Sequence, residues 1–270
     1  MRNKRSKLEP KIYKSKKDTP KGNILYFHGG GFFLGGKYDL PKYHIEQITT
    51  AGYNIISLNY PLAPESKFPI IIDYIIDSIN SFIKKIDQPY FLWGRSAGAY
   101  LSLLAYGKGL DKKPNGIISY YGYGLLVSDW YSQPNQEYLK QPLIKKESIT
   151  NLIEDDMILS SPVNPRYLLY LYSRQTGKWI DMVSDTSVED FVDKYNLENF
   201  SLENYPPVLL AHNTKDYDVP YKESVELSKK ISNSRLLTFN TDTHDFDRNT
   251  NDHNTIKLID ATINFIDQNI

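Results

Sequence analysis

The sequence has 270 residues, with 32 basic and 32 acidic side chains and no cysteine. Balanced charge produces no field that would draw the protein to nucleic acid or to an anionic membrane, and the lack of cysteine excludes disulfides and thiol chemistry. No apolar stretch has the length of a signal-peptide core or of a membrane span. We therefore expect a cytoplasmic protein with one large domain, and the sequence carries no indication of its oligomeric state.

Residues 1–21 differ from this balance, because they contain nine basic and only two acidic side chains. A charged segment without apolar periodicity is typical of a solvated chain terminus. We interpret residues 1–21 as a basic N-terminal tail, with a binding arm as the alternative, and place the globular domain at 22–270.

Short apolar runs that end at glycine or proline predict buried strands, and longer stretches with apolar residues at helical spacing predict helices. In chain order the pattern predicts strand 23–28, helix 42–51 closed by Gly52, strand 53–58, helix 70–86, strand 89–93, helix 99–106, strand 116–121, strand 207–212, helix 221–231, strand 235–239 and helix 255–266. This alternation predicts the α/β class, with a mostly parallel, doubly wound sheet.

The stretch from about 123 to 205 breaks the alternation of strands and helices. Its aromatic, charged and turn residues follow no strand rhythm, so we predict an inserted helical lid. Helices are expected at 145–153 and 188–195, and the two prolines in 160–166 predict a loop there.

A Gly-Arg-Ser-Ala-Gly pentapeptide at 94–98 lies between a predicted buried strand and a predicted helix. This context is typical of a nucleophile held on a sharp turn, where small flanking residues let chain and substrate approach. The amide of Ala97 opens the following helix and can stabilise negative charge on a carbonyl oxygen. The pattern predicts Ser96 as a nucleophile.

Three glycines follow His28 after the first strand. Glycines can turn several amides toward one point, as an oxyanion hole requires. A glycine-rich turn without chemistry is the alternative, and a phosphate loop is disfavoured because the motif lacks the Gly-Lys-Ser/Thr ending and the dinucleotide spacing.

A serine hydroxyl needs a base, and the base needs a carboxylate that orients it. His244 lies between the last strand and the last helix, at the sheet edge where Ser96 emerges, so we predict it as the base, with His253 in reserve. For the other histidines we expect structural positions, beside the glycines for His28, on a surface helix for His44 and at a strand end for His212.

Asp216 is the predicted carboxylate, because it follows the fifth strand and stands between the serine and the histidine in the chain. Asp218 is its rival, and an ordinary turn aspartate is the alternative for either.

Taken together, the segments 28–32, 60–65 and 94–98 with Asp216 and His244 resemble the hormone-sensitive-lipase-like branch of the α/β-hydrolases. The resemblance implies an α/β-hydrolase fold, a preference for short acyl chains, no metal or other cofactor, and a lid over the pocket. It implies a structural role for the segment 60–65, so Tyr60 and Glu65 are left out of the catalytic set. It implies this set of site residues: Ser96, Asp216 and His244 as triad, and Gly30, Gly31 and Ala97 as amide donors.

Arg95 and Ala99 depart from the pattern of that family, which usually has an acidic residue and a glycine at these positions. Arg95 could bind a substrate carboxylate or could be a surface arginine paired elsewhere.

We therefore predict a serine hydrolase that cleaves small carboxylic esters through an acyl-enzyme. A peptidase or amidase on the same scaffold and a non-catalytic binding module remain as alternatives.

Overall fold

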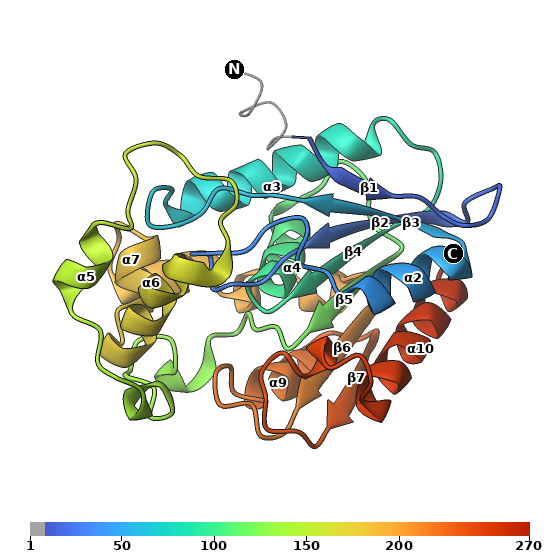
Figure 1. Ribbon diagram of the computed structural model, residues 1–270. Coiled ribbons are helices and arrows are strands. Elements are labelled where there is room, and N and C mark those ends of the chain that lie inside the picture. The colour runs from blue at the N-terminus through green and yellow to red at the C-terminus, as the bar shows by residue number, and fades with distance from the viewer. Residues whose placement is uncertain (1–8) are drawn as a thin grey trace.

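A computed structural model describes residues 9–270 and contains a seven-stranded sheet in the order β1-β3-β2-β4-β5-β6-β7 (Figure 1). β1 pairs with β3 in the antiparallel sense, and the other neighbouring strands are parallel. The strands are β1 Lys11–Tyr13, β2 Gly22–Phe27, β3 Tyr53–Leu58, β4 Tyr90–Arg95, β5 Gly116–Tyr120, β6 Val208–Asn213 and β7 Ser234–Phe239. The predicted α/β class with a mostly parallel sheet is confirmed.

Successive side chains of a strand point to opposite faces of the sheet. Both faces therefore carry apolar side chains, and helices cover each of them. Within β2, Ile24 packs toward one apolar cluster and Leu25 toward the other. The first cluster contains side chains of α2 (Lys42–Ala51) and α10 (His253–Gln268), and the second those of α3 (Phe68–Ile83), α4 (Ala97–Lys108) and α9 (Lys222–Lys230). Helix α2 has the predicted bounds, and Gly52 ends it at a φ of 107°.

The N-terminal segment differs from the predicted basic tail. Residues 1–8 lie outside the described residues, but Lys11–Tyr13 form β1 against β3. The backbone of these residues pairs with amide and carbonyl groups on the outer side of β3 that would otherwise have no partner in the sheet. Residues Lys11–Tyr13 of this segment therefore belong to the sheet.

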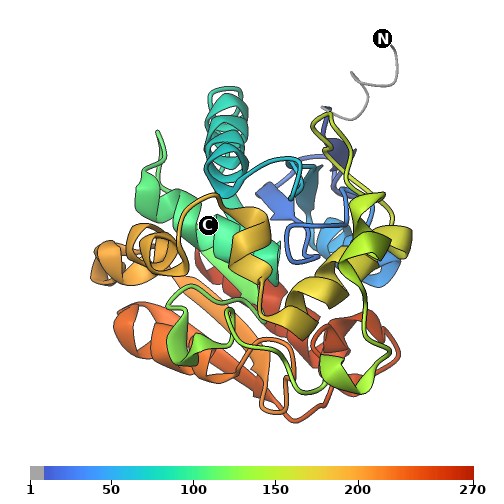
Figure 2. The same cartoon turned by 90° about the vertical axis from the view of Figure 1, so that its left-hand side faces the viewer.

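The connection between β5 and β6 carries several helices, which Figure 2 shows in front of one end of the sheet. The predicted helix at 188–195 is α8 Val188–Tyr195, and the one at 145–153 is the shorter α5 Lys146–Thr150. Two further helices were not predicted, α6 Val163–Thr176 and α7 Trp179–Val183. The connection also contains the 3-10 turns η1 Val127–Asp129, η2 Tyr138–Lys140, η3 Leu197–Asn199 and η4 Leu202–Asn204.

The predicted loop at 160–166 is wrong at its end, because α6 begins at Val163 and, after an extended Asn164 (φ −92°, ψ 138°), continues as a regular helix from Pro165. Pro162 is the residue that precedes the helix, and Pro165 lies in its first turn. A helix needs no amide hydrogens in its first turn, so prolines are tolerated there.

The register of the parallel strands brings their carboxyl ends to one edge. Phe27 pairs with Gly94, Arg95 with Tyr120, and Asn213 with Phe239. The loops that follow β2, β4, β6 and β7 therefore meet at this edge, as is usual for ligand sites in open α/β sheets.

Candidate active site

Ser96 lies at the turn between β4 and α4, in a backbone conformation that is rare for residues other than glycine. Its φ is 52° and its ψ is −120°. A Cβ atom at Gly94 would stand 2.1 Å from the carbonyl oxygen of Gly98, and one at Gly98 would stand 2.2 Å from that of Phe27. Both glycines are therefore required by close backbone contact, and the turn projects the serine side chain from the sheet edge.

The structure brings Ser96, His244 and Asp216 together from three separate loops. Oγ of Ser96 lies 2.9 Å from Nε2 of His244, and Nδ1 of the same ring lies 2.7 Å from Oδ2 of Asp216. An ionised carboxylate only accepts hydrogen bonds, so Nδ1 carries a proton, and the neutral ring presents a lone pair at Nε2 to the serine hydroxyl. His253, the reserve histidine, is an exposed residue at the start of α10.

The carboxylate of Asp216 is fully buried and accepts hydrogen bonds from several donors. The amides of Asp218 and Val219 donate to Oδ1 at 2.9 and 3.0 Å, and Nε2 of His212 lies 3.1 Å from Oδ2. His212 is thus a second imidazole on this carboxylate, a contact that the sequence analysis missed. The four-residue spacing from His212 to Asp216 was the available signal.

Asp218, the rival carboxylate, has different partners. The hydroxyl of Tyr170 donates to its two oxygens at 2.6 and 2.7 Å, and Nε of Arg174 donates to Oδ1 at 3.2 Å. Its Oδ2 lies 3.9 Å from Nε2 of His244, too far for a hydrogen bond but close enough for strong charge interaction.

The charges around His244 favour its protonated form. Burial opposes that form, but the carboxylates of Asp216 and Asp218 outweigh burial and raise the pKa of His244 to about 9. Burial also opposes the ionised form of Asp216, yet the charge of His244 and the hydrogen bonds from both histidines hold the pKa of Asp216 below its ordinary value. The carboxylate of Asp216 therefore stays charged at neutral pH.

The glycine loop after β2 lies beside Ser96, and two of its three glycines have left-handed conformations. Gly30 and Gly31 have φ values of 97° and 58°. The hydroxyl of Tyr60 donates to the carbonyls of His28 and Gly29 at 2.9 and 3.1 Å, which fixes the start of the loop. Ala97 opens α4, where the first amides of a helix have no partner within the helix.

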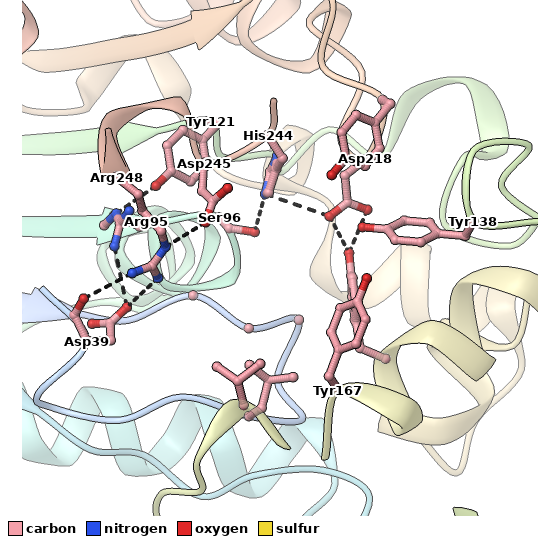
Figure 3. A pocket seen from close by; sticks show the side chains of 17 residues that line it. Asp39, Arg95, Ser96, Tyr121, Tyr138, Tyr167, Asp218, His244, Asp245 and Arg248 are labelled. Atoms are coloured by element: carbon pink, nitrogen blue, oxygen red, sulfur yellow. Dashed lines mark hydrogen bonds and ion pairs between the residues drawn. The ribbon is translucent and has the colours of Figure 1, made fainter. Parts of the chain in front are cut away.

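A pocket of about 410 Å³ connects these groups. Figure 3 shows Ser96 and His244 at its centre, with Asp39, Arg95 and Arg248 on one side and Asp218, Tyr138 and Tyr167 on the other. Its lining is Gly29, Gly30, Gly31, Leu34, Asp39, Arg95, Ser96, Tyr121, Tyr138, Val163, Tyr167, Tyr170, Tyr217, Asp218, His244, Asp245 and Arg248. Five of these residues come from the connection between β5 and β6, which therefore forms one wall: Tyr121, Tyr138, Val163, Tyr167 and Tyr170.

Two residues expected at the surface are buried. Arg95 is 1% exposed and forms an ion pair of 2.7 Å with Asp247, so it is paired elsewhere, as expected, but not at the surface. His44 is 0% exposed, because α2 packs against α10 and the Asp247 carboxylate lies 2.9 Å from Nε2 of His44.

Comparison with known proteins assigns the family. The BD-FAE family model matches residues 11–231. The chain belongs to the BD-FAE family. Its similarity to solved α/β-hydrolase structures confirms the predicted fold, as well as the resemblance found in the sequence.

Two solved structures match almost the whole BD-FAE chain. A protein of unknown function from Staphylococcus aureus subsp. aureus Mu50 is 32% identical, with a TM-score of 0.87 over 96% of this chain and 94% of that chain. An alpha/beta hydrolase superfamily protein from Enterococcus faecalis is 27% identical, with a TM-score of 0.85 over 95% and 94%. A hormone-sensitive lipase from a metagenome library shares the fold at 19% identity and a TM-score of 0.65, over 95% and 81%.

Within the described residues 9–270 of this BD-FAE member, none of the helices combines the length and the apolar character that crossing a membrane requires. The same residues contain no group of three or more His, Cys, Asp or Glu side chains that could hold a metal ion.

Proposed function

We propose that this protein is a serine hydrolase that cleaves small carboxylic esters with a short acyl chain. The observation that carries the proposal is the pair of contacts at His244, with Ser96 at 2.9 Å from one ring nitrogen and Asp216 at 2.7 Å from the other. Family membership and the fold shared with a hormone-sensitive lipase support an ester as the substrate.

In the proposed reaction, Ser96 attacks the ester carbonyl while His244 accepts the proton of its hydroxyl. The amides of Gly30, Gly31 and Ala97 stabilise the negative charge on the carbonyl oxygen, and His244 then donates its proton to the leaving alcohol. Water, activated by His244, cleaves the acyl-enzyme and releases the acid. Asp216 holds the ring and stabilises its charged form throughout.

The pocket supports a preference for small acyl groups. The ring of Tyr170 lies so close to the glycine loop that a Cβ on Gly31 would stand 2.3 Å from it. This ring limits the room beside the proposed oxyanion donors, and the surrounding tyrosines offer apolar surface with polar tips.

Replacement of Ser96 by Ala tests the proposal. We expect loss of p-nitrophenyl acetate hydrolysis and of labelling by a fluorophosphonate, at an unchanged unfolding midpoint. Ser102→Ala is a matched control, since this serine lies on α4 and is buried with its hydroxyl bonded to the carbonyl of Gly98. Turnover or labelling that survives in Ser96→Ala contradicts the assignment. A matched amide substrate, measured beside the ester, separates esterase from amidase.

A further inference from the structure

A second group of buried polar side chains lies next to Ser96 and has no part in the proposed triad. Arg95 is 1% exposed and Asp247 is 0% exposed. Nη2 of Arg95 donates to Oδ1 of Asp247 at 2.7 Å, and its Nε donates to the hydroxyl of Tyr121 at 2.6 Å. The Tyr121 hydroxyl donates to the same Oδ1 at 2.7 Å. The three side chains form a closed triangle of hydrogen bonds.

This triangle connects the turn of the nucleophile with the loop of the base. Arg95 is the last residue of β4 and directly precedes Ser96. Tyr121 follows β5, and Asp247 lies three residues after His244 in the 3-10 turn η5, Phe246–Arg248. The group therefore fixes the loop of His244 relative to Ser96.

Tyr121 extends this connection to the imidazole itself. The ring centroids of Tyr121 and His244 are 4.8 Å apart, with the rings inclined by 63°, so one ring meets the other edge-on. Tyr121 has a φ of 38°, a conformation that is strained for a residue other than glycine and persists only where surrounding contacts impose it.

Further contacts hold Asp247 and Arg95 from outside the triangle. Nε2 of His44 lies 2.9 Å from Oδ2 of Asp247, and Nη1 of Arg95 lies 3.5 Å from Asp39. Charges buried in this way cannot separate without leaving an ion unpaired in a dry environment, which is strongly destabilising. The group is therefore rigid at the place where two loops must keep a fixed distance.

We infer that Arg95, Tyr121 and Asp247 position the imidazole of His244 against the hydroxyl of Ser96. The inference rests on the proposed function, because the arrangement matters for turnover only if these two residues react with an ester. The three residues are positioning residues, since they act through His244 and not on the reacting atoms. They also explain why an arginine precedes the nucleophile here: its partner acid stands in the loop of the base.

The test compares Tyr121→Phe and Asp247→Asn with the wild type. Tyr121→Phe keeps the ring and the ion pair and removes one hydroxyl, so it should fold. A misplaced reacting group costs up to about a hundredfold in rate, so we expect kcat and the rate of fluorophosphonate labelling to fall together by about ten- to a hundredfold, with KM unchanged.

Tyr53→Phe and Asp267→Asn are controls away from the site, because the Tyr53 hydroxyl donates to Asp267 at 2.5 Å and Lys21 pairs with the same carboxylate at 2.6 Å. Tyr53 is the first residue of β3, so it lies at the amino ends of the parallel strands, away from the edge where Ser96 lies. The inference is wrong if the loss of kcat per degree of lowered unfolding midpoint is the same in the Tyr121 and Asp247 variants as in the controls. The loss would then reflect stability alone.

A crystal structure of each variant decides the inference without any substrate. We expect Nε2 of His244 to move out of hydrogen-bond distance from Oγ of Ser96 in Asp247→Asn, and an unchanged arrangement in both variants would overturn the inference. Failure of the proposed function has a different signature, because the wild type itself would then show neither turnover nor labelling.

Discussion

Oδ2 of Asp218 lies 3.9 Å from Nε2 of His244, the ring nitrogen that also faces Ser96. Asp216 holds the opposite nitrogen at 2.7 Å, so the imidazole stands between two carboxylates. Tyr170 and Arg174 keep Asp218 in place. Both carboxylates favour a proton on the ring, which makes the proposed base dependent on pH.

The first prediction concerns this pH dependence. Only the neutral ring can accept a proton from Ser96, so kcat/KM for an ester should rise with pH up to about 9, the pKa of His244. Asp218→Asn removes a negative charge and should move this rise to lower pH. Profiles of kcat/KM against pH measure the shift. Asp111→Asn, at a surface aspartate that pairs with Lys84, is the control, and an identical rise in Asp218→Asn and the control would contradict the prediction.

The second prediction separates the two aspartates as partners of the base. Loss of the orienting carboxylate in a serine triad lowers kcat by about ten-thousandfold, because the ring adopts the wrong tautomer. We expect a loss of this order for Asp216→Asn and a much smaller one for Asp218→Asn. Steady-state kinetics of both variants on one ester decide the question, and a greater loss in Asp218→Asn would reverse the assignment.

The third prediction concerns acyl-chain length and Tyr170, whose ring lies against the glycine loop. Tyr170→Ala removes the ring and should raise kcat/KM for octanoate esters relative to acetate esters. Tyr170→Phe is the control, because it loses the bond to Asp218 but keeps the ring, and it should keep the preference of the wild type. A series of p-nitrophenyl esters measures the ratio. An unchanged ratio in Tyr170→Ala would show that other residues set the limit.

The fourth prediction concerns stability and the buried carboxylate of Glu223 on α9. It accepts hydrogen bonds from the amides of residues 124 to 127 and from the indole of Trp130. Each buried donor left without a partner costs about 1–3 kcal/mol, so Glu223→Leu should lower the free energy of unfolding by at least about 2 kcal/mol. Urea denaturation measures this change.

Glu226→Leu on the same helix is the control for this substitution, because Glu226 forms an exposed pair with Lys229. A surface substitution changes stability by no more than about 0.5 kcal/mol. Equal losses in the two variants would show that Glu223 does not anchor the 124–130 loop.

Much of the fold could be predicted because its strands and helices have simple patterns. Buried parallel strands are short apolar runs, and Gly52 marks the end of α2 at the predicted position. The helix α6 was missed because prolines usually end helices, and here they begin one. The edge strand β1 has three residues and no apolar run, so its pairing depends on the open edge of β3 and not on its own sequence.

Placement of the candidate site followed from strand order, since the loops after parallel strands share one edge. The predicted residues Ser96, His244 and Asp216 are indeed within hydrogen-bond distance, while their catalytic roles remain predictions. The burial of Arg95 was not predictable, because its partner Asp247 is 152 positions away along the chain. Tyr170 was missed as a pocket residue because it lies on α6, which was not predicted as a helix owing to its two prolines.

The helical connection leaves the sheet after β5 and returns in β6, and these two strands are direct neighbours with Tyr120 opposite Ala211. Because the strands are parallel, the insertion begins at the carboxyl end of β5 and ends at the amino end of β6, where Val208 lies opposite Ile117. Ser96, Asp216 and His244 all lie outside it. Sequence changes within the insertion can therefore alter the pocket wall without changing the strands and loops that hold these three side chains.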